Sequence, residues 1–420
     1  MKFSISMSAA VLAAVASNTL WIPGAHASPD SGKTVSLAAL VNRSLQANPD
    51  VLAAQSAVDA AKARLGGTAL PLHNPALEAE VESAGANTYQ LGISQTIDWH
   101  DKRSAFEQLA QTEYQAVRQQ LAALKLAKST ELLDAIGRIA SQTGIKDLSQ
   151  RRTQIMTRFA NLAKQRHAAG DIPQAELELA RLSLAESKMQ LAGNQAELIQ
   201  AHGDFFSLSG QMLTEKISLP ANLKLHLVAA EDIESIARQH PEVQAALLQA
   251  QKARQNIRAT DLDRKADPTL GISAGRDDKD NLIAFRFSLP LQVRNSFQSQ
   301  VEVARAEALQ LEQLAQQAFW NVRARLNSAE QRYKLVSSAW AQWTEKGRSS
   351  LNSRIALLET LWKSGEISTT DYLLQIQQTL DTQIAGIELH GDLWNAWLAW
   401  MSASAQLDTW LNKALRKPRT

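Results

Sequence analysis

Alternating apolar and polar residues predict four short β-strands, arranged as two pairs. In the first strand Leu77, Ala79 and Val81 are each followed by a glutamate, and in the second strand Gln95 is the one break in the alternation. A period of two gives each strand one apolar face and one polar face. The polar segments 85–87 and 276–280 are predicted to form hairpin turns. The expected strands cover about residues 76–83, 89–99, 269–275 and 282–292.

A spacing of three and four residues between apolar positions predicts helices on both sides of each strand pair. The helices that follow the strands are expected to be long, because no proline occurs between Pro75 and Pro173 or between Pro290 and Pro418. Each would have roughly 70 residues and extend roughly 100 Å, which is typical of coiled coils rather than compact domains. The expected helices cover residues 37–69, 103–169, 233–264 and 296–363.

The chain contains the same order of elements twice. Three motifs recur in the same order at a nearly constant offset: 48–51 with 240–243, 74–77 with 267–270, and 169–172 with 364–367. The sequence therefore predicts two related halves, residues 35–210 and 229–406, with a linker around 219–222 and a C-terminal tail, 407–420. In each half, Gly170 or Gly365 is expected to mark a sharp reversal into a returning helix.

The N-terminal residues 1–27 are predicted to be a secretory signal peptide. Lys2 supplies a positive start, residues 5–15 form a short, mainly apolar stretch, and Ala25-His26-Ala27 fits a small-x-small cleavage site. The alternative is a membrane anchor, but this apolar stretch is too short to cross a bilayer. No later stretch has 18 consecutive apolar residues, so no transmembrane helix is expected.

The expected strands have the length that a tilted membrane strand needs. Four strands cannot close a barrel, and an open edge cannot lie in lipid because its backbone groups would be unsatisfied. Two chains would give eight strands with a filled interior, and three would give twelve strands with room for a pore. The alternative is a soluble protein with the sheet packed on helices. Four residues are expected to face the lumen: Glu78, Glu80, Glu82 and Arg286.

Composition excludes several classes of function. The chain has 420 residues and no cysteine, which excludes disulfides, thiolate nucleophiles and zinc–thiolate sites. Its net charge is +2 without a basic patch that interleaves aromatic residues, so no nucleic-acid binding is expected. The eight histidines form no zinc motif, and no phosphate loop is present. We therefore expect no enzyme, no metal ligand and no cofactor, and a driving force that comes from a partner.

Tryptophans are concentrated in the second half of the chain. Trp394, Trp397 and Trp400 are three residues apart, a spacing that favours packing in a helical core over a ligand-binding box. Trp99, at the end of an alternating strand, is instead expected in an aromatic belt at a membrane interface.

Two motifs resemble the outer membrane efflux protein (TolC-like) family, and the resemblance covers essentially the whole mature chain. Residues 74–77 (Asn-Pro-Ala-Leu) with Glu80 resemble the entry to the family's first strand. Residues 92–99 followed by Asp101-Lys102-Arg103 resemble the strand exit, most similarly in the heavy-metal (cobalt-zinc-cadmium) branch. That branch usually has Gly-Lys-Arg here, and Asp101 stands in place of the glycine.

The resemblance implies a homotrimer in the outer membrane with a large periplasmic portion. Twelve strands would form a β-barrel in the lipid, continuous with an α-barrel of long helices. Such a trimer would be the exit duct of a tripartite efflux system, with a periplasmic adaptor and an inner-membrane pump of the resistance-nodulation-division type, and divalent heavy-metal cations as the expected solutes. The alternatives are a duct for drugs or for type I protein secretion and, less expected, a periplasmic adaptor.

The resemblance also implies an acidic periplasmic aperture. Asp371 matches an acidic position that lines it in the family, and Glu176 is assigned only by the internal repeat. The local alternative is a capping box in which Asp371 serves the helix N-terminus. The helix-turn tips, expected to contact the adaptor or pump, comprise Gly170, Asp171, Gly365 and Glu366.

Overall fold

A computed structural model describes residues 37–83, 87–213, 217, 219–220, 223 and 230–416. The expected signal peptide, residues 1–27, lies outside these residues. So do residues 85–86 of the first expected turn and residues 221–222 of the expected linker.

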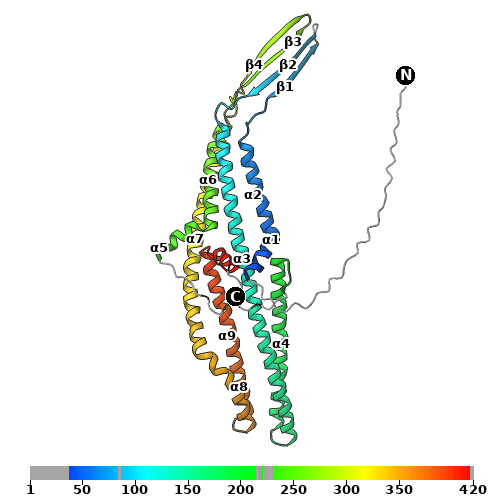
Figure 1. The fold of residues 1–420 in the computed structure, drawn as a ribbon, viewed down its shortest axis with the longest axis vertical. Coiled ribbons are helices and arrows are strands. Elements are labelled where there is room, and N and C mark those ends of the chain that lie inside the picture. Colours follow the sequence, from blue (N-terminus) through cyan, green and yellow to red (C-terminus); the bar gives the residue numbers. More distant parts are fainter. Residues whose placement is uncertain are drawn as a thin grey trace, which may run out of the picture. The chain divides into compact units, whose positions relative to one another are not determined.

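The described chain is mainly helical with one four-stranded antiparallel sheet, which confirms the expected fold class (Figure 1). The strands are β1 (Ala76–Ser83), β2 (Asn87–Thr96), β3 (Thr269–Asp277) and β4 (Asp280–Ser288). The helices are α1 (Leu37–Ala47), α2 (Pro49–Thr68), α3 (Lys102–Ala168), α4 (Gln174–Ser209), α5 (Ala230–Gln239), α6 (Pro241–Asp263), α7 (Gln298–Gln342), the π-helical segment η1 (Trp343–Gly347), α8 (Arg348–Lys363), α9 (Thr369–Ala403) and α10 (Leu407–Arg416). No helix in these described ranges is both long enough and apolar enough to cross a lipid bilayer.

Two strands end earlier than their alternation predicts. The second strand ends at Thr96, because the carboxylate of Asp98 turns to accept the N–H groups of Lys102 and Arg103 at the start of α3. The fourth strand ends at Ser288, two residues before Pro290, which has no N–H for a strand ladder. The second hairpin is tighter than expected, since Asp277 and Asp280 belong to strands.

The first long helix has the expected length, whereas the second is interrupted. The 67 residues of α3 extend about 100 Å. The expected continuous helix over 296–363 is instead α7, then η1, then α8. The indole of Trp343 lies against Gly347 and Gly386, where a Cβ atom on either glycine would collide with the ring. A π-helical turn thus accompanies the placement of a bulky indole in a closely packed helix pair.

The main hydrophobic core surrounds the middle of α3 and the C-terminal part of α9. Trp394, Trp397 and Trp400 are almost fully buried there, as their spacing predicts. The indole N–H of Trp394 donates to the Leu133 carbonyl at 3.0 Å, which satisfies its polar atom inside the core. This core fixes α9 on α3 and so joins the two halves of the sequence.

Candidate functional site

The sheet has one apolar face and one polar face, and both are open to solvent in the single chain. Large apolar side chains on one face are more than half exposed, up to 83% for Phe285. The described helices therefore do not cover this face, and the alternative of a sheet packed on helices is wrong. The exposed apolar set comprises Leu77, Val81, Tyr89, Leu91, Ile93, Ile272, Ile283, Phe285 and Phe287.

An ion pair spans the polar face from its last strand to its first. Arg286 on β4 contacts Glu78 on β1 at 2.6 Å and Glu80 at 3.2 Å. Strands spaced about 4.8 Å apart would hold β1 and β4 about 14 Å apart in a flat sheet. The contact therefore indicates a sheet curled toward its polar face, across the small residues Gly271 and Ser94 that lie in register with Arg286.

Three of the four expected lumen residues are thus brought together, and the fourth lies apart. The Ser94 hydroxyl also donates to the Glu78 carboxylate at 2.6 Å, which fixes that side chain on the polar face. Glu82 lies on the same face in register with Thr88, nearer the hairpin turn. It is exposed there.

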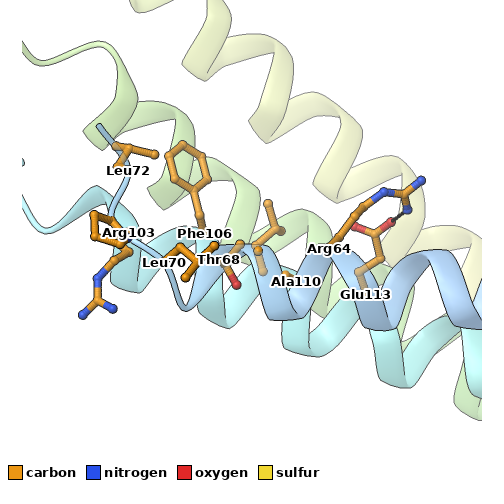
Figure 2. A pocket seen from close by; sticks show the side chains of 11 residues that line it. Arg64, Thr68, Leu70, Leu72, Arg103, Phe106, Ala110 and Glu113 are labelled. Atoms are coloured by element: carbon orange, nitrogen blue, oxygen red, sulfur yellow. Dashed lines mark hydrogen bonds and ion pairs between the residues drawn. The ribbon is translucent and has the colours of Figure 1, made fainter. Parts of the chain in front are cut away.

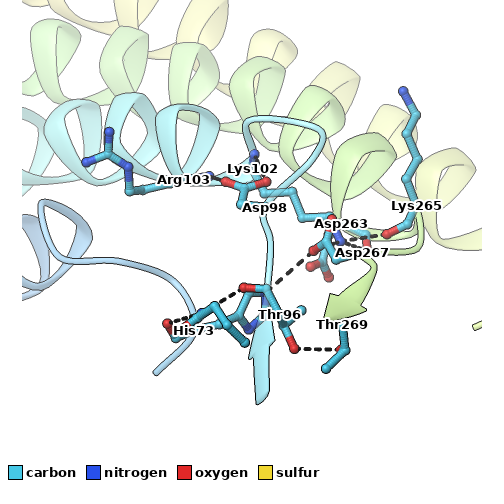
Figure 3. Close-up of polar contacts among 10 residues, drawn as sticks. His73, Thr96, Asp98, Lys102, Arg103, Asp263, Lys265, Asp267 and Thr269 are labelled. Carbon is cyan, nitrogen blue, oxygen red and sulfur yellow. Dashed lines mark hydrogen bonds and ion pairs between the residues drawn. The ribbon is translucent and has the colours of Figure 1, made fainter. Parts of the chain in front are cut away.

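A buried ion pair anchors the base of the sheet to the helices (Figure 3). The ammonium of Lys102 lies 2.9 Å from the Asp267 carboxylate, and both side chains are at most 7% exposed. Lys102 also donates to the carbonyls of Asp263 and Lys265. The pair joins the first residue of α3 to the segment before β3, and so connects the two halves. Sequence reasoning singled out Lys102 within a motif but missed its partner.

The carboxylate of Asp98 holds the start of α3 beside this pair (Figure 3). Partial burial opposes its ionisation, but hydrogen bonds from the Arg103 and Lys102 N–H groups outweigh burial, and the pKa of Asp98 is lowered. A negative charge at a helix N-terminus is also stabilised by the helix dipole. Asp98 therefore acts as a fixed anionic cap for α3.

Both helix reversals occur at the predicted glycines. Gly170 and Gly365 have φ angles of 84° and 79°, in the left-handed region that glycine adopts without steric cost. The next residue closes each turn: the Asp171 N–H donates to Arg166 and the Glu366 N–H to Leu361, both at 2.9 Å. These are Schellman-type helix ends, which leave the side chains of Asp171 and Glu366 exposed.

The two candidate aperture acids make different contacts. Asp371 accepts a hydrogen bond from the Ser368 hydroxyl at 2.7 Å, and the same hydroxyl accepts the Asp371 N–H at 3.1 Å, so the local capping interaction is present. Glu176, at the start of α4, accepts a hydrogen bond from the Thr369 hydroxyl at the start of α9. Glu176 therefore links the two helix-turn tips within one chain.

An aromatic cluster beside the tips was not foreseen from the sequence. Phe159 of α3 packs against Trp362 and Tyr372, with ring centroids 4.5 and 5.1 Å away. Arg166 lies over the Trp362 ring at 5.5 Å. Burial raises the pKa of Tyr372 to about 12, so this phenol stays neutral. Because its members come from distant parts of the chain, no local sequence pattern marks this cluster.

A groove of about 460 Å³ lies along α2, α3 and the segment after α2 (Figure 2). Its walls include Leu70, Leu72 and Phe106, and Arg64 is paired with Glu113 at 2.8 Å. These groups give an apolar surface with charged margins and no nucleophile or acid–base pair. In the described part of the chain, no three histidine or acidic side chains converge as a metal site.

Several solved outer-membrane channels share this architecture. The channel CusC matches 88% of this chain and 92% of its own with a TM-score of 0.73 and 15% identity. The outer-membrane channel OprN matches 88% of this chain and 89% of its own with a TM-score of 0.74 and 17% identity. CmeC of Campylobacter jejuni matches 90% and 89%, with a TM-score of 0.74 and 14% identity. This is an outer-membrane channel fold.

No family model matches the sequence, and no curated protein matches it. The similarity to the solved channels is therefore one of fold, and it extends over nearly the whole of both chains. The four-stranded sheet and the two long helical hairpins of this chain are parts of that shared fold.

Proposed function

We propose that this protein is the outer-membrane channel of a tripartite efflux system. The observation that carries the proposal is the sheet, whose apolar face is exposed and whose outer strands β1 and β4 pair with no further strand of the described chain. An apolar face of this size suits lipid, and unpaired edges in lipid require strands from other chains. The proposed site is therefore complete only in an assembly located in the outer membrane.

Three copies satisfy this requirement with twelve strands. Within the chain, β2 of the first half pairs with β3 of the second half. The internal repeat makes β4 the counterpart of β2, and β1 the counterpart of β3. The same antiparallel pairing between β4 of one copy and β1 of the next closes the barrel around a pore. We propose that Glu78, Glu80, Glu82 and Arg286 line this pore, as a polar barrel interior requires.

The helical part provides the passage below the membrane. A helix as long as α3 is long enough to bridge much of the periplasm, so that solute need not re-enter it. We place the tips at Gly170, Asp171, Gly365 and Glu366 against a periplasmic adaptor and a pump of the resistance-nodulation-division type. Asp371 and Glu176 would there form acidic rings that attract cations. This role is transport rather than enzymatic catalysis.

Divalent heavy-metal cations are the proposed solutes. Their support is the Asp101-Lys102-Arg103 motif, similar to the metal-resistance branch, together with the acidic side chains of the proposed pore. A duct for drugs or for protein secretion is the alternative. Deleting the gene from its host and measuring growth separates these solutes: zinc or cadmium sensitivity is expected, whereas sensitivity to drugs alone would exclude the metal assignment.

The channel itself is tested with the mature chain in detergent and in planar bilayers. Light scattering in detergent should give the mass of a trimer. Insertion of this trimer into a planar bilayer should produce discrete steps of conductance, and the current should be selective for cations. A monodisperse monomer with intact secondary structure would contradict the proposal. So would a trimer that never increases bilayer conductance under conditions in which a reference porin does.

A further inference from the structure

The polar face of the sheet carries its charged side chains in two groups. The outer row lies nearest the hairpin turns, in register across all four strands, and comprises Glu82, Thr88, Asp277 and Asp280. The inner cluster lies nearer the ends at which the helices join the sheet, and comprises Glu78, Glu80 and Arg286. In the proposed channel the outer row is therefore at the external mouth of the barrel, and the inner cluster lies below it.

Within the described residues, no basic side chain forms an ion pair with the outer row. Asp277 accepts its hydrogen bond from the neutral hydroxyl of Thr88, at 2.7 Å. The basic residues of the second hairpin lie elsewhere: Arg276 is in register with Tyr89, on the apolar face of the sheet, and Lys279 belongs to the turn. Among the described residues the outer row therefore contributes three negative charges and no positive charge per copy.

Arg286 cancels half of the negative charge of the inner cluster. Its guanidinium lies 2.6 Å from the Glu78 carboxylate and 3.2 Å from the Glu80 carboxylate, although β1 and β4 are the two edges of the sheet. In the proposed ring, β1 of the next copy adjoins β4 from the other side, so each guanidinium stays beside glutamates of one copy or the other. In either arrangement the inner cluster keeps one positive charge for two negative ones.

The charge of Arg286 acts on the inner cluster and not on the outer row. Arg286 and Asp280 are six residues apart on β4, which is about 20 Å at about 3.3 Å per residue. The Debye length at physiological ionic strength is about 8 Å, so salt screens the guanidinium before its field reaches the outer row. Ala284, two residues from Arg286 on the same face of β4, is only about 7 Å away.

We infer that Arg286 makes the charge selectivity of the barrel pore unequal along its length. The inference rests on the proposed function, which places the polar face of the sheet in the lumen. Because Arg286 offsets Glu78 and Glu80, the section next to the helices attracts cations weakly, whereas the outer row attracts them strongly at the mouth. A cation that leaves the helical tube therefore meets a potential that becomes more negative outwards, and an anion from outside is repelled at the mouth.

Reaction rates at single cysteines measure this potential at each level of the pore. The chain has no cysteine of its own, so one introduced thiol is the single reactive group. A cationic and an anionic methanethiosulfonate are added separately to whole cells, and the ratio of their rates, divided by the ratio for a small free thiol, follows the local potential. Ala284→Cys reports on the inner cluster and Thr88→Cys on the outer row. The ratio of cationic to anionic rate should be higher at Thr88→Cys than at Ala284→Cys.

Changing Arg286 should alter one of these ratios and not the other. Arg286→Gln should raise the ratio at Ala284→Cys by about two- to fivefold, the size expected for one charge at about 7 Å in salt water. It should leave the ratio at Thr88→Cys unchanged, because about 20 Å is more than two Debye lengths. Arg286→Lys keeps the charge and is the matched control, with both ratios as in the wild-type background. A merely structural role of Arg286 would change both reagents' rates together and leave their ratio constant.

A second variant tests the outer row without a change at Arg286. Glu82→Gln removes one carboxylate beside Thr88, its partner in register. The ratio at Thr88→Cys should fall by about two- to fivefold, by the same estimate for one nearby charge. The ratio at Ala284→Cys should change less, because Ala284 lies in the row of Glu78, four residues along β1 from Glu82.

The outcomes separate this inference from the proposed function. If both cysteines react from outside but Arg286→Gln leaves the Ala284→Cys ratio unchanged, or raises both ratios equally, the inference is overturned while the channel proposal stands. The same holds if Glu82→Gln lowers both ratios equally. If neither cysteine reacts in cells whose outer membrane contains the protein, the polar face does not line the lumen, and the inference falls together with the proposed pore.

Discussion

The buried ion pair between Lys102 and Asp267 predicts a large local effect of a conservative change. Asp267→Asn keeps the shape of the side chain and removes its charge. Lys102 would then remain buried with only the carbonyls of Asp263 and Lys265 and a neutral amide around it. Because the pair joins the start of α3 to the segment before β3, the substitution should lower the local stability at the base of the sheet and not at the distant helix tips.

The size of the effect follows from the separation and the burial. Two charges about 3 Å apart at an effective dielectric constant of about 20 attract by about 5.5 kcal/mol. Desolvation offsets much of this attraction in the intact pair, but removing one partner leaves the other charge buried and costs about 3–5 kcal/mol. Asp267→Asn should destabilise by an amount near the lower limit of this range, since two backbone carbonyls still accept hydrogen bonds from the Lys102 ammonium. Lys102→Met should destabilise by an amount near the upper limit of this range, since His73, at 3.5 Å, is then the one basic side chain of the described residues in ion-pair contact with the Asp267 carboxylate.

Hydrogen exchange measures this loss where it occurs. A loss of about 3–5 kcal/mol in local opening free energy should speed exchange of β2 and β3 amides by about 10²- to 10⁴-fold. Amides near Phe159 and Tyr372 at the tips serve as the internal control and should exchange at the wild-type rate. The double variant should lose less than the two single variants added together, with a coupling of about 1–3 kcal/mol.

Two results would refute this reasoning. One is an acceleration below tenfold in both single variants, which would mean that water reaches the pair and replaces the missing partner. The other is strict additivity in the double variant, which would mean that Lys102 and Asp267 contribute independently.

Three further predictions concern pH, selectivity and the two faces of the sheet. His240 caps α6 with its Nδ1 atom, which accepts the Glu242 N–H at 3.3 Å, and burial lowers the pKa of His240. The neutral imidazole therefore stabilises the fold fully above the unfolded pKa of 6.5, and this stabilisation is lost as pH falls below that value. His240→Asn, which copies the Asn48 cap of α2, should make the free energy of unfolding, measured by urea titration, less dependent on pH below 6.5. Parallel pH curves for the wild type and the variant would contradict this. Asp371→Asn should reduce the cation preference of the pore in planar bilayers. Ser368→Ala should lower the free energy of unfolding by about 1 kcal/mol and leave the selectivity unchanged. Equal selectivity in the wild type and Asp371→Asn would show that Asp371 does not line the aperture. Single cysteines at Glu78, Glu80 and Glu82 should react with a charged thiol reagent in membranes faster than cysteines at Leu77, Ala79 and Val81, and equal rates would contradict the assignment of the two faces.

The elements of this fold were predictable because their signals are local and periodic. Alternation around Val81 specified a strand with one apolar face, and glycines at 170 and 365 specified the reversals between helices. The exact ends were less predictable. Alternation continues to Trp99, but the strand ends at Thr96 because the Asp98 carboxylate caps the next helix, and such capping competes with strand pairing.

The contacts that join distant parts of the chain were not predictable from periodicity. Lys102 and Asp267 are far apart in sequence, and neither lies in an apolar pattern that would mark it as buried. The π-helical segment accompanies an indole, that of Trp343, which meets two glycines, one of them on another helix. For Asp371, the sequence left two interpretations open, and the single chain shows the capping contact while the aperture role concerns an assembly.

If the chain is exported and inserts into the outer membrane, as proposed, the exposed apolar face of its sheet affects what happens before insertion. Until it reached lipid, such a chain would present the apolar side chains of Leu77 on β1 and Phe285 on β4 to water, and the outer edges of these two strands pair with no other strand among the described residues. Such surfaces favour unspecific association, and open strand edges template aggregation. Aggregation depends on concentration more steeply than insertion of a single chain does. The yield of functional protein should therefore fall when export outpaces insertion, and periplasmic holding chaperones should relieve that loss.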